Sequence, residues 1–184
     1  MTYKGGKAWY RMDQTDCISH FLDECEIDCV RPVKSPMPDK SLLMKDGTPL
    51  SASGATEYRS RVGSLRYFAE CTRWDLAQPC ARLAQCLKAP IRSNWQALDH
   101  VLAYLRTMQG YGLEGPSLGQ TTFDMFVGSG HAGDRDLGNR SHTGIMFLCN
   151  GVPYHWRSNK QPVAAKSSAE AEIYALSQAV QDMK

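Results

Sequence analysis

The sequence lacks long apolar runs, because no stretch of its 184 residues reaches the roughly 20 apolar residues of a membrane-spanning helix. Its first residues, MTYKGGKAWYRMD, also lack the apolar core of a signal peptide. We therefore expect no membrane insertion. A formal net charge of +2 is too small to indicate nucleic-acid binding by itself, and a hydrophobic content of 42% is ordinary for a globular protein.

The sequence has no Cys-x-x-Cys pair, and its seven cysteines are an odd number. Both facts argue against a secreted disulfide framework, so we expect an intracellular, reducing compartment. Four soft zinc ligands do lie close together in the chain: Cys17, His20, Cys25 and Cys29. Their spacing matches no common zinc knuckle. The alternative is a short helix that places Cys17, Phe21 and Leu22 on one face.

The positive charge is concentrated in the middle of the chain, where residues 51–110 hold eight Lys/Arg against four Asp/Glu. A basic surface of this kind can meet a phosphate backbone. A solvated helical surface has the same composition, so the charge alone leaves both interpretations open.

Helical periodicity predicts a short helix over 13–24 and three further helices over about 56–71, 75–88 and 93–110. Ser93 and Gln96 have the spacing of a capping box for the last of these. The expected core stripes are Val62, Leu65, Phe68 and Ala69; Leu76, Cys80, Leu83, Ala84 and Leu87; and Trp95, Leu98, Leu102 and Leu105. The four prolines of residues 31–53 predict an extended connection rather than packed structure.

After Thr121 the pattern becomes that of strands, which we predict over 123–127, 143–149 and 152–158. Asn150-Gly151 joins the last two and is the strongest hairpin signal in the sequence. Antiparallel strands followed by a helix predict an α+β fold.

A final helix is predicted to open at Ser167-x-x-Glu170, which has the form of a capping box. Ile173, Leu176 and Val180 follow at helical spacing, and we expect them to face the core. The predicted division of the whole chain is a short helix and Pro-rich linker (1–53), a three-helix region (54–116) and an incomplete α+β half-domain (117–184).

Residues 134–176, with the segments WRSNKQP (156–162) and SSAEAEIYAL (167–176), closely resemble the start of the ribonuclease H domain of copia-type retrotransposon polyproteins. Residues 58–77 and 94–113 look like the helical thumb or connection that follows the polymerase palm in the same polyproteins. The resemblance is colinear and covers nearly the whole chain. It implies a thumb-like helical region followed by a truncated ribonuclease H-like sheet with one helix. Since no Tyr-x-Asp-Asp motif is present, we expect no DNA synthesis.

The resemblance also implies where catalytic carboxylates belong. Aligned on the shared Ala-Gly-Asp, the family's first two aspartates fall at Gly128 and Gly130, and His131 replaces a tryptophan. Only the helix glutamate is kept, as Glu172. Asp124 lies four residues from Gly128 along the strand, a distance of roughly 13 Å. Asp134 matches a family residue outside the metal cluster.

Two-metal hydrolysis needs several oxygen ligands, so we expect no catalysis and no cofactor; Mg²⁺ is expected only if an intact site is rebuilt. Glu172 is then a vestigial catalytic residue, or an acid favoured by the helix dipole.

The first functional hypothesis is therefore an inactive, retrotransposon-derived module that binds RNA or an RNA–DNA hybrid. Its candidate phosphate contacts are Arg59, Arg66, Arg73, Arg140, Arg157 and Lys160. Trp95, Tyr154 and Trp156 are candidates for base stacking, with core packing as the alternative.

The second hypothesis is a structural subunit of a larger protein or ribonucleoprotein assembly, docked through an unpaired sheet edge. A third is a fragment of an active polyprotein, whose ribonuclease H cleaves RNA in hybrids with two Mg²⁺ ions once the missing segments complete it.

Overall fold

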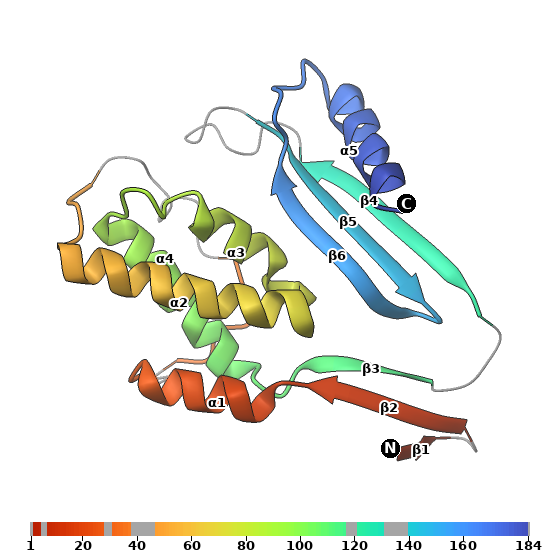
Figure 1. Ribbon diagram of the computed structural model, residues 1–184, viewed down its shortest axis with the longest axis horizontal. Helices are drawn as coiled ribbons and strands as arrows, with labels where there is room; N and C mark the ends of the chain where they lie inside the picture. Colours follow the sequence, from red (N-terminus) through yellow and green to blue (C-terminus); the bar gives the residue numbers. More distant parts are fainter. Residues whose placement is uncertain are drawn as a thin grey trace. The chain divides into compact units, whose positions relative to one another are not determined.

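The computed structural model describes residues 2–4, 7–27, 31–37, 47–116, 121–130 and 140–183. The chain forms two compact units (Figure 1). One is continuous, Asp13–Gly112, and is helical. The other combines Met1–Met12 with Leu113–Lys184, a pairing of the two ends that the predicted division at residues 53 and 116 does not contain. The combination of helices with antiparallel sheets confirms the predicted α+β class.

The helices of the continuous unit confirm the predicted ones, with shifted ends. They are α1 (Thr15–Glu24), α2 (Ala52–Cys71), the short 3-10 helix η2 (Trp74–Leu76), α3 (Ala77–Ala84) and α4 (Arg92–Thr107). Helix α2 begins earlier than predicted because the Ser51 hydroxyl accepts from the Gly54 N–H (3.1 Å) and caps it. The predicted Ser93 cap is wrong, because α4 begins at Arg92 and the Asn94 side chain accepts from the Ile91 N–H (3.0 Å).

The predicted stripes form the core of this unit. Val62, Leu65, Phe68, Ala69, Leu76, Cys80, Leu83, Leu98, Leu102 and Leu105 are all buried in one cluster. Leu87 and Trp95 pack against it, and Ala84 is half-buried. Tyr58 is also buried, and its hydroxyl donates to the Leu83 carbonyl oxygen at 2.9 Å. The helical period therefore identified the core-facing side of α2, α3 and α4.

The described parts of the predicted linker, residues 31–53, are packed rather than merely extended. Pro49 forms a β-bridge with Ile91 at the start of α4. The Val33 N–H donates to Oγ1 of Thr107 at 3.1 Å. No helix forms in the described residues 31–37 and 47–51, as the prolines predict, and the Val33 N–H and Pro49 are paired with residues of the helical unit.

Burial of Cys80 makes the helical core sensitive to alkali. Burial raises the pKa of this thiol from 9.0 to about 12, and the charge of Asp75 adds to the effect. The folded state therefore favours the neutral thiol, whose stabilising effect is complete below pH 9 and is lost as the pH rises toward 12. Across that window the free energy of unfolding falls by about 1.4 kcal/mol for each increase of one in pH.

We expect the urea midpoint of the chain to fall between pH 9 and 11, and that of Cys80→Ala to fall less steeply. The measurement is urea unfolding followed by circular dichroism at each pH. Cys71→Ala, which replaces an exposed thiol, serves as the matched control. An identical pH dependence for the parent chain and Cys80→Ala would contradict the assignment.

The second unit contains a three-stranded antiparallel sheet in the order β4-β5-β6, formed by β4 (Phe123–Gly130), β5 (His142–Cys149) and β6 (Val152–Lys160). All three predicted strands are confirmed and are longer than predicted. Asn150 and Gly151 adopt φ of 53° and 77°, as a two-residue type I′ turn requires. Helix α5 (Ser168–Asp182) lies across one face of this sheet, against β4 and β5 (Figure 1).

Helix α5 packs on the sheet through a different side from the predicted one. Ala171, Ala175 and Ala179 are its buried residues. The predicted core residues Ile173, Leu176 and Val180 are exposed, at 69%, 49% and 50%. The prediction of their direction is wrong because small alanines allow the helix to lie close to the sheet, and this leaves the larger apolar side chains on the outer face.

A second sheet, in the order β1-β2-β3, was not predicted. It comprises β1 (Thr2–Lys4), β2 (Lys7–Asp13) and β3 (Gly112–Pro116). Strand β3 approaches the start of β6 so closely that a Cβ on Gly115 would lie 2.0 Å from Cγ2 of Val152. Glycine is therefore required at this position by the close approach of a side chain.

Candidate functional site

The first turns of α5 bring one carboxylate to the end of β4. Oε1 of Glu172 accepts a hydrogen bond from the backbone N–H of Ser129 at 3.2 Å. Strand β5 occupies the other side of β4, with Ser129 opposite Thr143. Glu172 thus satisfies the backbone donor of Ser129, the residue between Gly128 and Gly130, on the edge strand of the described sheet.

The start of α5 is held in place by two devices. The Ser167 hydroxyl caps the helix by accepting from the Glu170 N–H at 3.1 Å. The buried Gln161 donates through Nε2 to the Ala171 carbonyl oxygen (2.9 Å) and to Oγ1 of Thr143 (3.1 Å). Gln161 thereby ties the helix to β5. Sequence reasoning did not identify this residue, although it lies inside the WRSNKQP segment.

The predicted catalytic positions on β4 are sterically open and carry no charge. A Cβ built on Gly128 or on Gly130 meets no atom within 4 Å. Asp124 pairs with Leu148, four positions along the ladder from Gly128, so it is not brought to Glu172. His131 and Asp134 lie outside the described residues. Among the residues that the structure describes, the site therefore presents a single carboxylate, and this donor set does not fit a pair of Mg²⁺ ions, which requires several oxygen ligands.

The far end of α5 is anchored by charge. Asp182 accepts from Nη1 of Arg157 at 3.2 Å and lies 3.8 Å from Nε2 of His155. Arg157, a predicted phosphate contact, is 39% exposed and already has this partner. Its pairing with Asp182 therefore connects β6 to α5, whether or not Arg157 also contacts phosphate.

The remaining predicted phosphate contacts differ in availability. Arg66 is 69% exposed and pairs with Glu70 at 2.6 Å. Arg59 is exposed, and its Nε donates to the Leu87 carbonyl oxygen at 2.9 Å. Arg140 is exposed, and Lys160 is half-buried.

Arg73 does not belong to any surface, because its side chain is fully buried. Its Nε and Nη2 donate to the two carboxylate oxygens of Asp75 at 3.0 and 2.7 Å. The guanidinium also lies over the rings of Tyr104 and Tyr111, at 5.8 Å from each centroid. The prediction that Arg73 contacts phosphate is corrected on this ground: the residue stabilises the helical core.

The three aromatic residues predicted to stack on bases differ in their exposure and contacts. Trp95 packs against the helical core and lies under the Arg61 guanidinium at 5.0 Å, so it is used in packing. Tyr154 is 56% exposed and contacts the rings of Phe123 and Phe147. Trp156 is half-buried on β6, opposite Met146.

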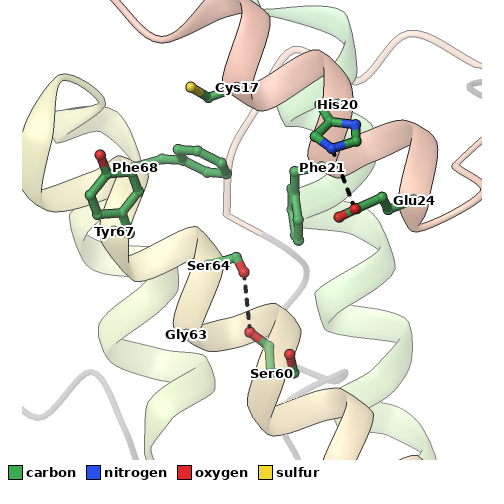
Figure 2. A pocket seen from close by; sticks show the side chains of 9 residues that line it. All are labelled: Cys17, His20, Phe21, Glu24, Ser60, Gly63, Ser64, Tyr67 and Phe68. Atoms are coloured by element: carbon green, nitrogen blue, oxygen red, sulfur yellow. Dashed lines mark hydrogen bonds and ion pairs between the residues drawn. The ribbon is translucent and has the colours of Figure 1, made fainter.

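An open groove lies between α1 and α2 of the helical unit (Figure 2). It has a volume of about 570 Å³ and is lined by Cys17, His20, Phe21, Glu24, Ser60, Gly63, Ser64, Tyr67 and Phe68. His20 and Glu24 lie on its rim, 3.5 Å apart, with 80% and 65% of their side chains exposed. Because its polar groups are solvated rather than buried and convergent, we assign no ligand to it.

Two of the four candidate zinc ligands, Cys17 and His20, line this groove. Cys17 is exposed beside it, whereas Cys25 is buried and burial raises the pKa of its thiol, which disfavours the thiolate that zinc binds. Cys29 lies outside the described residues. Within the part of the chain that the structure describes, no three His, Cys, Asp or Glu side chains are grouped to hold a metal ion.

Within the described ranges, none of the helices combines the length and apolar character needed to cross a membrane.

Comparison with known proteins finds relatives of this chain among effector proteins and transposon polyproteins. The secreted RxLR effector protein 161 of Plasmopara viticola is 41% identical over 125 residues, which are 68% of this chain and 87% of that protein. The retrovirus-related Pol polyprotein from transposon TNT 1-94 of Nicotiana tabacum is 31% identical over 96% of this chain. The corresponding polyprotein from transposon RE1 of Arabidopsis thaliana is 30% identical over 94% of it.

The chain spans only 13% and 12% of the two polyproteins. No family model matches the chain, and no solved structure matches it.

Proposed function

Because this chain belongs to the family of retrovirus-related Pol polyproteins from copia-type transposons, we propose that it is a ribonuclease H-like module that binds nucleic acid without cleaving it. The observation that carries the proposal is the end of β4. Glu172 lies there beside Ser129, and the two positions where the family pattern has aspartates are glycines. The helix glutamate of the family pattern is kept at this position, but the charges of the two aspartates are absent.

The loss of cleavage follows from the chemistry of two-metal hydrolysis. One ion activates water, the other stabilises the leaving oxygen, and both are held by shared carboxylates. Glu172 alone cannot hold such a pair of hydrated ions, and at the end of β4 the glycines supply no oxygen from side chains. Removal of aspartates also removes repulsion toward phosphate, so the same change favours binding of a polyanion.

The binding function rests on exposed cations. Arg59 and Arg66 are seven residues apart on α2, share one side of the helix and reach solvent. Arg140 is exposed two residues before the start of β5. Contacts of this type address phosphates rather than bases, so the binding is weakly sequence-selective and strongly salt-dependent.

The unequal coverage of the relatives supports a separate module. The chain covers 87% of the effector but only 13% of the TNT 1-94 polyprotein. A relative of about this size therefore exists outside a polyprotein, and we propose that this chain also acts on its own or in an assembly.

A structural role is the second candidate, and the free edge of β4 favours it. Among the described strands, β4 has a neighbour only on the β5 side. Such an edge can accept a strand from a partner protein, which would complete the sheet. A fragment that becomes an active nuclease when completed would use the same edge, but it would still need carboxylates that β4 does not provide.

We expect the purified chain to bind a labelled RNA–DNA hybrid and to leave it intact in Mg²⁺. Two or three phosphate contacts give a slope of roughly −2 to −3 in log K against log[salt]. The measurement is a fluorescence-anisotropy titration at several salt concentrations, with the reaction products run on a denaturing gel. Arg66→Gln combined with Arg140→Gln should weaken binding and reduce the slope by about two.

Arg31→Gln is the charge-matched control for this experiment, because Arg31 is exposed but lies outside the proposed contacts. It should leave the affinity nearly unchanged. Binding that ignores salt, or no binding at low salt, would favour the structural role. Cleavage that depends on Mg²⁺ would favour the completed nuclease.

A further inference from the structure

The outer face of α5 carries a row of four large apolar side chains that the described part of the protein leaves in solvent. Ile173, Leu176, Val180 and Met183 are 69%, 49%, 50% and 65% exposed. The opposite side of the helix, formed by three alanines, is the side that packs on the sheet. A surface helix normally turns its large apolar residues toward its own core. This reversal indicates that the outer row has a different partner.

The spacing of the row defines the geometry of that partner. The four residues are separated by three, four and three positions, which is the a–d repeat of a coiled coil over two heptads. Met183 extends the row because its backbone is still helical at the C-cap. Ile173 and Val180 are β-branched and occupy the first position of each heptad, while Leu176 and Met183 occupy the fourth. This arrangement of branched a and unbranched d residues favours two helices.

We propose that the row is a self-association surface, which pairs α5 with α5 of a second copy of this chain about a two-fold axis. A two-fold contact uses the same patch on both partners, so the row must be compatible with itself. The flanking positions meet this condition: Ser177 and Ala179 are neutral, and Glu172 is engaged by the Ser129 N–H of its own chain. Glu172 is the one charged residue among these described flanking positions, and its carboxylate already accepts a hydrogen bond within its own chain.

The pairing is limited by the length of the helix. Its 15 residues span about 22 Å, at 1.5 Å per residue. Two heptads form a short seam, and isolated helices of this length are marginal in water. Here each helix is already held on its sheet, by Gln161 at one end and by Arg157 and Asp182 at the other. We therefore expect dissociation in the micromolar range.

Sedimentation equilibrium of the full chain tests the proposal. The apparent mass should rise from 20.5 kDa toward twice that value as the concentration passes through the micromolar range. Leu176→Glu places two charges in the middle of the seam and should raise the dissociation constant at least tenfold. Because Leu176 is half-exposed, the variant should keep the circular dichroism and thermal midpoint of the parent.

Gln181→Glu is the matched control, since it adds the same charge to an exposed position of α5 outside the row. It should leave the dissociation constant within about twofold of the parent. A parent chain that stays monomeric throughout would overturn the proposal and leave the row to a different polypeptide. A parent dimer that Leu176→Glu does not weaken, or that both variants weaken equally, would also overturn it. Hybrid binding is measured separately, so either proposal can fail without the other.

Discussion

Replacing Arg73 with methionine lowers the free energy of unfolding by about 3–5 kcal/mol, the range for breaking a buried ion pair on one side. The guanidinium is fully buried, forms a two-pronged contact with Asp75 and lies over the rings of Tyr104 and Tyr111. Methionine fills part of the volume but leaves the Asp75 carboxylate without its cation. Among the hydrogen-bond donors from described side chains, the Tyr104 hydroxyl, which donates to Oδ2 at 2.7 Å, then remains beside that charge.

Urea unfolding followed by circular dichroism measures this loss, and Arg66→Met supplies the matched control. Arg66 makes an equally short pair with Glu70, but both side chains are largely exposed, so its removal should cost under about 1 kcal/mol. The double variant Arg73→Met with Asp75→Leu should recover part of the loss, because it leaves no buried charge unpaired. Equal losses for the two single arginine variants would contradict the assignment.

The combined substitutions Gly128→Asp and Gly130→Asp give the chain a divalent-cation site that the parent lacks. Both positions point to the same side of β4, since side chains alternate along a strand. Neither substitution meets a steric barrier, because a Cβ at either glycine has no atom within 4 Å. Glu172 lies at the residue between them. Three carboxylates then supply the oxygen ligands that hard cations require.

Isothermal titration with Mn²⁺ and Mg²⁺ measures this gain. We expect binding at least tenfold tighter than to the parent chain, and near-parental affinity when Glu172→Gln is added to the double variant. Glu170, in the first turn of α5, provides the control, because its carboxylate accepts from the Lys166 N–H and not from β4. If Glu172→Gln and Glu170→Gln had the same effect, the three carboxylates would not form one site.

Local patterns predicted most of the helices and the main hairpin. The stripe of α2, with Val62 and Leu65 at its centre, faced the core because most large apolar residues of that helix lie on one side, with Tyr67 as the exposed exception. Asn150-Gly151 adopted the left-handed backbone that a two-residue hairpin needs. The residue types predict this conformation, because Asn and Gly adopt positive φ more readily than other residues.

The direction of α5 was not available from its period. A helical stripe shows that apolar residues share one side, but the stripe of Ile173 and Leu176 faces solvent in the described chain. The small alanines on the other side pack on the sheet because they allow the helix to lie close to it. This close approach is seen only in the structure. The burial of Arg73 was equally hidden, since arginine is usually exposed and its partner Asp75 is identified by the fold of the turn.

The candidate site was predicted in part, and only through the family resemblance. That resemblance placed Glu172 and the two glycines of β4 in one site, and the structure joins Glu172 to Ser129 between them. It did not indicate Gln161, whose role depends on burial between β5 and α5. The β1-β2-β3 sheet was missed because it joins residues 2–13 to residues 112–116, a pairing that no short window of sequence contains.

The division of the chain has a consequence for its synthesis. The helical unit, Asp13–Gly112, is continuous, whereas the other unit is built from segments on both sides of it. As the chain leaves the ribosome, β2 is complete long before β3, its neighbour in the sheet, exists. The helical unit can form meanwhile, because domains fold as units during translation. Strands β1 and β2 therefore lack their partner strand β3 until it has been synthesised. During that interval they are accessible to a co-translational chaperone.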